Sequence, residues 1–183
     1  MNWKTSESHP LRIAEVNLGE HQKLGLSFCP GKTQPNAMSG PWMRDLQADL
    51  FRIRSKGYEV VVSLIEGHEF VELEVDEMRK GAVENAEMKW IWVPIVDGDV
   101  PTDANDDGLN EVVNSLISGE SVFVHCKGGL GRAGTVSAWL LTHFGRTAQE
   151  AISEVRGVRK GALENQRQER WVSNNATMFL GCE

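Results

Sequence analysis

The stretch that most constrains the fold runs from Ser121 to Thr135, SVFVHCKGGLGRAGT. An apolar run, Val122 to Val124, leads into His125 and Cys126, and a glycine-rich loop follows. Apolar residues at helical spacing then continue from Val136 to Phe144. This order predicts a buried strand, a loop in which backbone N–H groups converge, and a helix whose positive end faces that loop. Such a loop suits a tetrahedral anion.

Cys126 lies at the base of this loop, and Arg132 closes it with Cys-x5-Arg spacing. The converging N–H groups, the helix dipole and the guanidinium would all favour a thiolate over a thiol. A cysteine that ends a buried strand is more often an inert small hydrophobe, and glycines after a strand are more often a turn. The combination of strand, glycines, arginine and helix nevertheless favours a nucleophile beneath an anion-binding loop. The expected anion-binding residues are Lys127, Gly128, Gly129, Leu130, Gly131 and Arg132.

Length and composition indicate one soluble domain. The 183 residues are 40% apolar and 25% charged, which suits a single domain over residues 1–183, with 1–9 disordered or loosely ordered. A net charge of −7 gives no general affinity for nucleic acid or for anionic membranes. No apolar run approaches the ~20 residues that cross a bilayer, and the first residues lack a signal pattern. We therefore expect a cytoplasmic protein, monomeric by default.

The cysteines point to a reducing compartment and to no metal centre. Cys29, Cys126 and Cys182 cannot all pair within one chain, and their wide spacing matches no zinc pattern. We expect reduced thiols and chemistry that needs neither a metal nor a cofactor. Cys29 is a candidate to form a disulfide with Cys126 under oxidation, but the sequence does not give the distance between them.

Extended and helical patterns alternate along the chain. The extended segments are 11–16, 24–29, 58–65, 88–96 and 122–124, and the helical ones are 41–57, 70–78, 103–119, 136–144, 147–156 and about 164–179. We expect the first two extended segments to form an edge hairpin, and Trp171, Val172 and Met178 to be the buried face of the last helix. The alternation predicts an α/β fold with a mostly parallel central sheet flanked by helices on both faces.

A candidate proton donor follows another strand. Ligand-binding loops in such sheets gather at the carboxyl ends of the strands, so Asp97 and Cys126 are expected to face one site. Cleavage of a phosphoester by a thiolate needs a proton for the leaving oxygen, and Asp97 is the candidate to supply it. A turn-forming aspartate before Gly98 is the alternative interpretation. Asp99 offers a second carboxylate and is the rival for the acid.

These motifs resemble one family. HCKGGLGRAGT resembles the signature loop of the cysteine-dependent protein tyrosine and dual-specificity phosphatases, in the branch of the cyclin-dependent-kinase-associated phosphatase. VPIVDGDVPT is similar to the general-acid loop of that branch, and GALENQRQERWV is similar to its glutamine loop. The resemblance implies a phosphatase-like fold, catalysis by Cys126, Arg132 and Asp97, and a phosphocysteine intermediate.

The resemblance also implies supporting residues. It makes His125 a residue that tunes the thiolate, although a core histidine would look the same in sequence. It makes Gln168, rather than Gln166, the residue that orients water or contacts phosphate; a surface glutamine is the alternative. The family commonly has Ser or Thr where this chain has Ala133. Thr135 is the possible substitute, but two residues further along a helix it points elsewhere.

The leading functional hypothesis is a protein phosphatase. Its substrates would be phosphotyrosine and also phosphoserine or phosphothreonine in a phosphorylated protein partner. The first alternative keeps the site and changes the substrate to a phosphoinositide or an RNA 5′-phosphate. The second is a non-catalytic module that binds phosphoresidues, which the alanine after Arg132 would suit.

Overall fold

A central five-stranded sheet organises the structure, a computed structural model that describes residues 2–177. The strand order is β1-β2-β7-β5-β6; β1 is antiparallel to β2, and the other neighbours are parallel. The strands are β1 (Ala14–Asn17), β2 (Lys23–Phe28), β5 (Val60–Ser63), β6 (Lys89–Trp92) and β7 (Val122–Cys126). The sheet is mostly parallel, as the sequence predicts.

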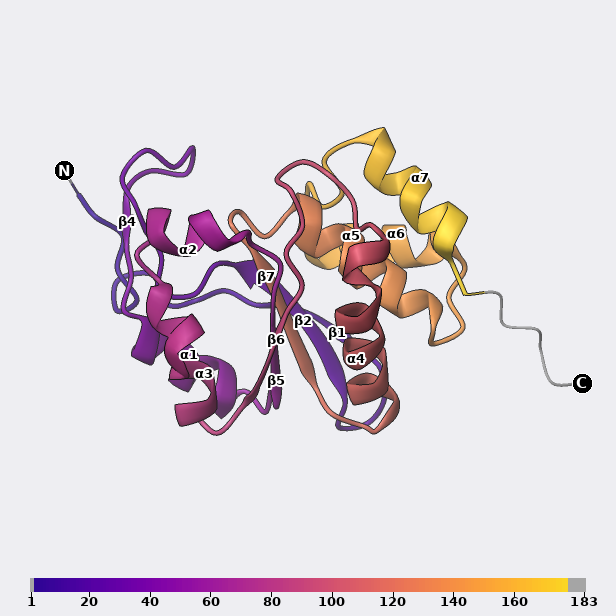
Figure 1. Cartoon of the computed structure of the whole chain (residues 1–183), viewed down its shortest axis with the longest axis horizontal. Coiled ribbons are helices and arrows are strands. Elements are labelled where there is room, and N and C mark those ends of the chain that lie inside the picture. Colours follow the sequence, from indigo (N-terminus) through magenta and orange to yellow (C-terminus); the bar gives the residue numbers. More distant parts are fainter. Residues whose placement is uncertain (1, 178–183) are drawn as a thin grey trace, which may run out of the picture.

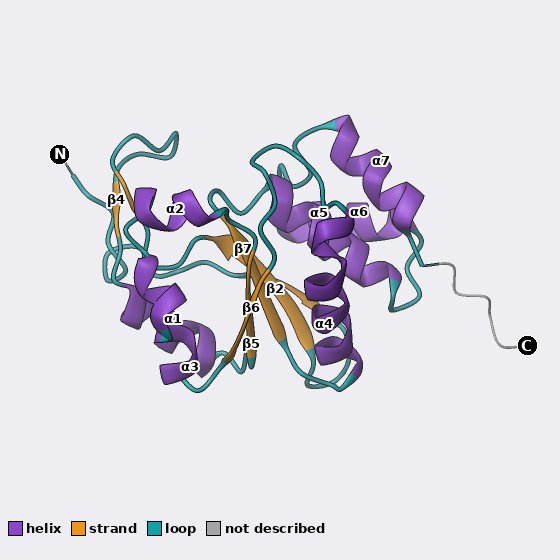
Figure 2. Ribbon diagram, in the orientation of Figure 1, coloured by secondary structure: helices purple, strands orange, loops and turns teal. Residues whose placement is uncertain are grey.

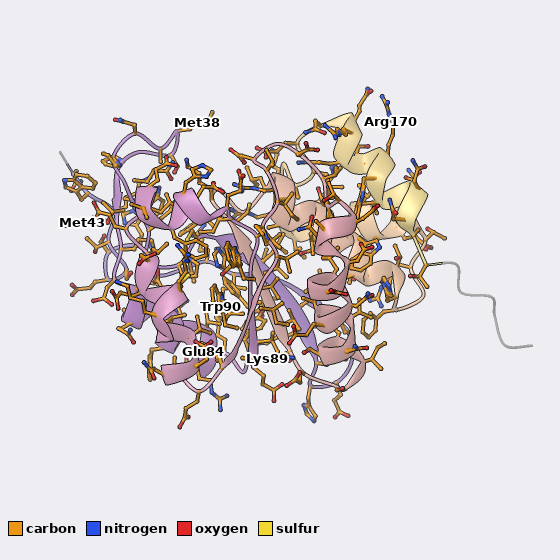
Figure 3. The ribbon with its side chains drawn as sticks, in the orientation of Figure 1. Met38, Met43, Glu84, Lys89, Trp90 and Arg170 are labelled. Atoms are coloured by element: carbon orange, nitrogen blue, oxygen red, sulfur yellow. The ribbon has the colours of Figure 1, made fainter. Side chains whose placement is uncertain are left out.

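Helices lie on both sides of this sheet, which confirms the predicted α/β architecture (Figures 1 and 2). One side carries α1 (Leu46–Ser55), α2 (Gly67–Glu72) and α3 (Ala82–Asn85); the other carries α4 (Asp106–Ile117), α5 (Gly131–Thr142) and α6 (Ala148–Val158). α7 (Gln166–Asn175) packs beyond α5 and α6. Short 3-10 helices, η1 (Asp76–Lys80) and η2 (Asp103–Asn105), complete the helical elements.

Burial explains why β7 lies in the middle of the sheet. All five of its residues are buried, and it pairs in parallel with β2 on one side and with β5 on the other. A strand covered on both faces is expected to be continuously apolar, and Val122 to Val124 fit this expectation. The carboxyl end of this central strand is therefore held on both sides.

Several predicted boundaries are wrong. The first helix does not begin near Pro41, because Trp42–Met43 form a short strand, β4, that pairs with β3 (Thr33–Gln34). The helix begins after Asp45, whose side chain accepts a hydrogen bond from the Ala48 N–H group and caps it. The segment 70–78 is also not one helix: it is divided between α2 and η1.

The hairpin prediction holds only in part. β1 and β2 are antiparallel neighbours, but β2 also pairs with β7 and is an interior strand. The last helix ends at Asn175 rather than near 179. Trp171 is half-buried and Val172 is fully buried, whereas Met178 lies outside the described residues.

The N-terminal residues contact a distant segment of the chain. Lys4 forms a parallel bridge with Trp42, Ser6 bonds to the backbone of Asp45, and the Arg44 guanidinium donates to the carbonyl of His9. The expectation that residues 1–9 are disordered or loosely ordered stays a prediction. Between residues 2 and 177, no helix combines the length and hydrophobicity that a membrane span requires.

Candidate active site

Cys126 ends β7 and is almost fully buried. Its Sγ accepts a hydrogen bond of 3.2 Å from the N–H group of Gly129. We call residues 126–132 the signature loop. Gly129 has a φ of 69°, and a Cβ on it would lie 2.2 Å from the carbonyl carbon of Ser27. The loop therefore packs against β2 so closely that only glycine fits at this position.

The signature loop presents unused backbone donors. In the described part of the chain, the N–H groups of Gly128 and Leu130 donate to no protein acceptor. α5 begins at Gly131, so its unpaired N-terminal N–H groups and its dipole add to the same region. This is the arrangement that the glycine-rich sequence predicts, and it can bind an anion beside the sulfur of Cys126.

Arg132 is buried in the first turn of α5, and its guanidinium is held by three groups. Nη1 and Nη2 donate to the two carboxylate oxygens of Glu69, at 2.6 and 2.9 Å. Nη1 also donates to the carbonyl of Ile95 at 3.0 Å, and Nη2 contacts Oδ1 of Asp97 at 2.9 Å. Within the described residues only Nε lacks a partner, although it is buried. One N–H donor is thus unused.

Glu69 was missed by sequence reasoning. It lies in α2, next to apolar residues, and nothing in its local pattern distinguishes it from a surface acid. Burial opposes its charge, but hydrogen bonds from Arg132 and the Glu66 N–H group, with the positive charges of Arg132 and Lys127, hold its pKa below the ordinary value. Glu69 is therefore an ionised partner that fixes the plane of the Arg132 guanidinium.

We expect Glu69→Gln to lower the free energy of unfolding by about 2–3 kcal/mol, because an amide cannot accept from both guanidinium nitrogens as a carboxylate does. Glu72→Gln is the matched control in the same helix: Glu72 is half-exposed and pairs with Lys127 at 2.6 Å. An exposed pair contributes at most about 1 kcal/mol. Urea unfolding of both variants measures the difference, and equal losses would contradict the role of Glu69.

The two candidate acids point to different partners. Asp97 contacts Arg132, and its side chain is 69% exposed. Asp99 accepts a hydrogen bond from the Val100 N–H group at 2.7 Å and pairs with Arg167 at 2.9 Å. The structure thus brings Asp97, and not Asp99, to the guanidinium of the signature loop.

The segment that carries Asp97, residues 94–102, is held by the start of α7; we call it the aspartate loop. Asn165 caps α7 and donates its side-chain amide to the carbonyl of Gly98 at 3.0 Å. Gln168 is fully buried; it donates to the carbonyl of Asp99 at 3.4 Å and accepts from the Glu164 N–H group at 2.8 Å. Its amide therefore contacts main chain, and it is not the surface glutamine of the alternative interpretation. Gln166 is exposed and bonds to Arg170.

The residues after Arg132 bring no hydroxyl to the sulfur. Ala133 is buried in the first turn of α5. Thr135 is also buried, but its hydroxyl donates to the carbonyl of Gly131 at 2.8 Å, along the helix. Thr135 therefore braces the first turn of α5, as its helical position suggests.

His125 is fully buried beside Cys126. Its Nε2 and the hydroxyl of Ser63 are 2.7 Å apart, and the Trp90 indole N–H donates to the same hydroxyl at 2.9 Å. Burial lowers the pKa of His125 to about 3, so its ring is neutral at neutral pH. The histidine thus links β7 to β5 and β6 beneath the loop.

Cys29 and Lys32 both contact the signature loop at the carbonyl of Lys127. Cys29 follows β2, is fully buried, and is a free thiol whose pKa is raised by burial. Lys32 is buried as well, and burial lowers its pKa to about 8. Its Nζ donates to the carbonyl of Lys127 at 3.2 Å. Cys182, the third cysteine, lies outside the described residues. Within residues 2–177, no cluster of His, Cys, Asp or Glu is arranged to hold a metal ion.

A family model describes most of this chain. The model named "Swiss Army Knife protein, DSP-PTPase phosphatase domain" matches residues 35–172, which include the signature loop, the aspartate loop and most of α7. The chain belongs to this family. The family resemblance of the segment HCKGGLGRAGT is thereby confirmed at the level of the dual-specificity phosphatase superfamily.

Relatives with curated names belong to the same superfamily. The dual specificity protein phosphatase CDC14C of Symphalangus syndactylus is 34% identical over 85 residues, 46% of this chain and 17% of that protein. The putative tyrosine phosphatase 197R of Invertebrate iridescent virus 6 is 35% identical over 115 residues, 59% of this chain and 40% of its own length. The chain therefore matches less than half of either relative.

Solved structures share the fold over nearly the whole chain. Kinase-associated phosphatase, with its catalytic cysteine replaced by serine, has a TM-score of 0.78 at 24% identity and covers 90% of this chain and 93% of its own. PTPMT1 in complex with PI(5)P has a TM-score of 0.65 at 20% identity and covers 89% of this chain and 94% of its own. These likenesses show that the chain shares the fold of these two proteins.

Proposed function

We propose that this chain hydrolyses phosphate monoesters of phosphorylated proteins, on phosphotyrosine and also on phosphoserine or phosphothreonine, through a phosphocysteine intermediate. The observation that carries the proposal is the contact of 2.9 Å between the Asp97 carboxylate, in the loop after β6, and the guanidinium of Arg132, which closes the loop that begins at Cys126. A nucleophile, a cationic clamp and an acid are what such a transfer requires.

In the first step, the Cys126 thiolate attacks phosphorus. The S–P bond forms, the ester P–O bond breaks, and the leaving oxygen takes a proton from Asp97. The backbone N–H groups of the signature loop and Arg132 stabilise the three equatorial oxygens. In the second step, water attacks phosphorus and passes a proton to Asp97. The S–P bond breaks, inorganic phosphate leaves, and the thiolate is restored.

Substrate binding would also release the acid. Arg132 has one unused donor, Nε, whereas a bidentate clamp on phosphate needs two N–H groups on one side of the guanidinium. Asp97 contacts Nη2 and is largely exposed, so it is the partner that an incoming phosphate can displace. Glu69 is buried and stays with the guanidinium. Displacement leaves Asp97 next to the ester oxygen, free to carry the proton it must donate.

The charges around the signature loop favour a phosphoprotein over a polyanionic lipid headgroup. The ammonium of Lys127 is paired with Glu72 at 2.6 Å, and that of Lys32 is buried against Gln34 and the Lys127 carbonyl. The charge of Lys127 is thus paired with a carboxylate and that of Lys32 is buried, whereas a multiply phosphorylated headgroup needs exposed, unpaired cations. The net charge of −7 likewise disfavours an RNA 5′-phosphate.

A substrate panel in EDTA tests the proposal. The panel holds p-nitrophenyl phosphate, peptides carrying phosphotyrosine, phosphoserine or phosphothreonine, a short-chain PI(5)P and a 5′-phosphorylated RNA, with Cys126→Ser protein as the blank. We expect hydrolysis of the aryl phosphate and the phosphopeptides, with a higher kcat/KM than for lipid or RNA. Faster hydrolysis of the lipid or the RNA than of the phosphopeptides would make that compound's class, and not phosphoproteins, the substrate class. Tight binding of phosphopeptides without turnover of any substrate would make this a binding module.

A further inference from the structure

Arg159 lies outside the signature loop, yet its side-chain hydrogen bonds go to that loop. It follows α6 as the C-cap residue and is half-buried. Its Nε donates to the carbonyl of Gly129 at 3.0 Å, and its Nη2 donates to the carbonyl of Gly128 at 3.1 Å. Among the described residues it has no carboxylate partner. In contrast, the nearby Arg156 pairs with Glu169 and bonds to the carbonyls of Ala162 and Leu163.

These two bonds determine where the loop N–H groups point. In a trans peptide, the carbonyl of one residue and the N–H of the next point in opposite directions. When the carbonyls of Gly128 and Gly129 face Arg159 outside the loop, the N–H groups of Gly129 and Leu130 face inward. The bond from the Gly129 N–H group to Cys126 Sγ agrees with this geometry. The Leu130 N–H group is one of the unused donors.

The loop depends on such a contact because two adjacent glycines have little conformational preference of their own. A Cβ on Gly128 would meet no atom within 4 Å, so packing does not fix that residue. The neighbouring carbonyls have other donors: Lys127 accepts from Lys32, and Leu130 accepts from the Leu163 N–H group at 3.3 Å. Within the described residues, Arg159 is the side chain that fixes both glycine peptides, and the planar guanidinium fork suits two adjacent carbonyls.

Arg159 also contributes positive charge close to the sulfur. Burial lowers the pKa of Arg159, and the negative charge of Cys126 opposes that shift, so the two groups lie within electrostatic range. A guanidinium stays charged at neutral pH. Its charge therefore adds attraction for an oxyanion bound in the loop, without contacting it.

We propose that Arg159 is a positioning residue that holds the signature loop in its anion-binding conformation. The proposal rests on the proposed function, since it assigns the loop to an oxyanion. It concerns a residue that touches only loop carbonyls, so its effect reaches the substrate through the backbone of Gly128 and Gly129.

Tungstate, a tetrahedral oxyanion, is the binding probe, measured by calorimetry, and iodoacetamide alkylation of Cys126 followed by mass spectrometry is the second readout. We expect Arg159→Met to weaken tungstate binding by about tenfold or more and to slow alkylation, because two charge-assisted hydrogen bonds are lost. Arg159→Lys keeps the positive charge but not the planar guanidinium that donates to both carbonyls. Its tungstate affinity and alkylation rate should therefore lie between those of Arg159→Met and the parent. Lys160→Met, which removes the exposed charge next in the chain, should behave as the parent.

Each outcome separates the two proposals. A parent protein that neither binds tungstate nor hydrolyses any monoester would remove the proposed function. A parent that does both, with Arg159→Met binding tungstate as tightly as the parent, would overturn the role of Arg159 alone. Circular dichroism and urea unfolding establish whether each variant is folded; if the Met variant is not, the Lys variant decides by the same comparison.

Discussion

Replacing Cys126 with serine should reduce the hydrolysis of p-nitrophenyl phosphate by roughly 10⁴-fold or more. A serine hydroxyl remains protonated at neutral pH and is a much weaker nucleophile than a cysteine sulfur. Steady-state kinetics in EDTA measure the loss.

Cys29→Ser is the matched control for this experiment. Cys29 is also a buried free cysteine at the end of a neighbouring strand, but burial raises the pKa of its thiol, so it is not a nucleophile at neutral pH. Activity close to that of the parent is expected for Cys29→Ser once its folding has been verified. The Cys126→Ser protein should still bind tungstate, because the backbone N–H groups and Arg132 are unchanged. Substantial turnover by Cys126→Ser would contradict the nucleophile assignment.

Replacing Asp97 with alanine should have two effects of opposite direction. The kcat for phosphotyrosine should fall by about 10²–10⁴-fold, because the leaving oxygen no longer receives a proton. The loss should be smaller for p-nitrophenyl phosphate, whose leaving group needs less protonation. Tungstate should bind more tightly than to the parent, because removal of the carboxylate frees Nη2 of Arg132 and removes a negative charge beside the anion.

Two further variants separate these effects. Asp97→Asn also removes the acid but keeps an oxygen that can accept from Arg132, so its gain in tungstate affinity should be smaller than that of alanine. Asp99→Ala should keep a kcat close to the parent value, because the Asp99 carboxylate pairs with Arg167 rather than Arg132. A larger loss for Asp99→Ala than for Asp97→Ala would reverse the assignment of the acid.

Local patterns were sufficient for the fold class and for the signature loop. The buried strand Val122–Val124, the glycines and the helix after them are contiguous in the chain. Each is predicted by a local property: the apolar run, the backbone freedom of glycine, and the periodicity and dipole of the helix. Boundaries were less predictable. Trp42–Met43 have helical spacing relative to Leu46 but pair with Thr33–Gln34, because backbone hydrogen bonding between segments overrides periodicity.

The sequence by itself determined that Cys126 and Arg132 flank one glycine-rich loop between a strand and a helix, since these residues are close in the chain and the local pattern defines the three elements. Only the tertiary structure revealed Glu69, which reaches Arg132 from α2, and Arg159, which reaches the glycine carbonyls from the end of α6. It also separated Asp97 from Asp99. Each of these contacts joins segments distant in sequence, and chain folding, not local pattern, brings their side chains together.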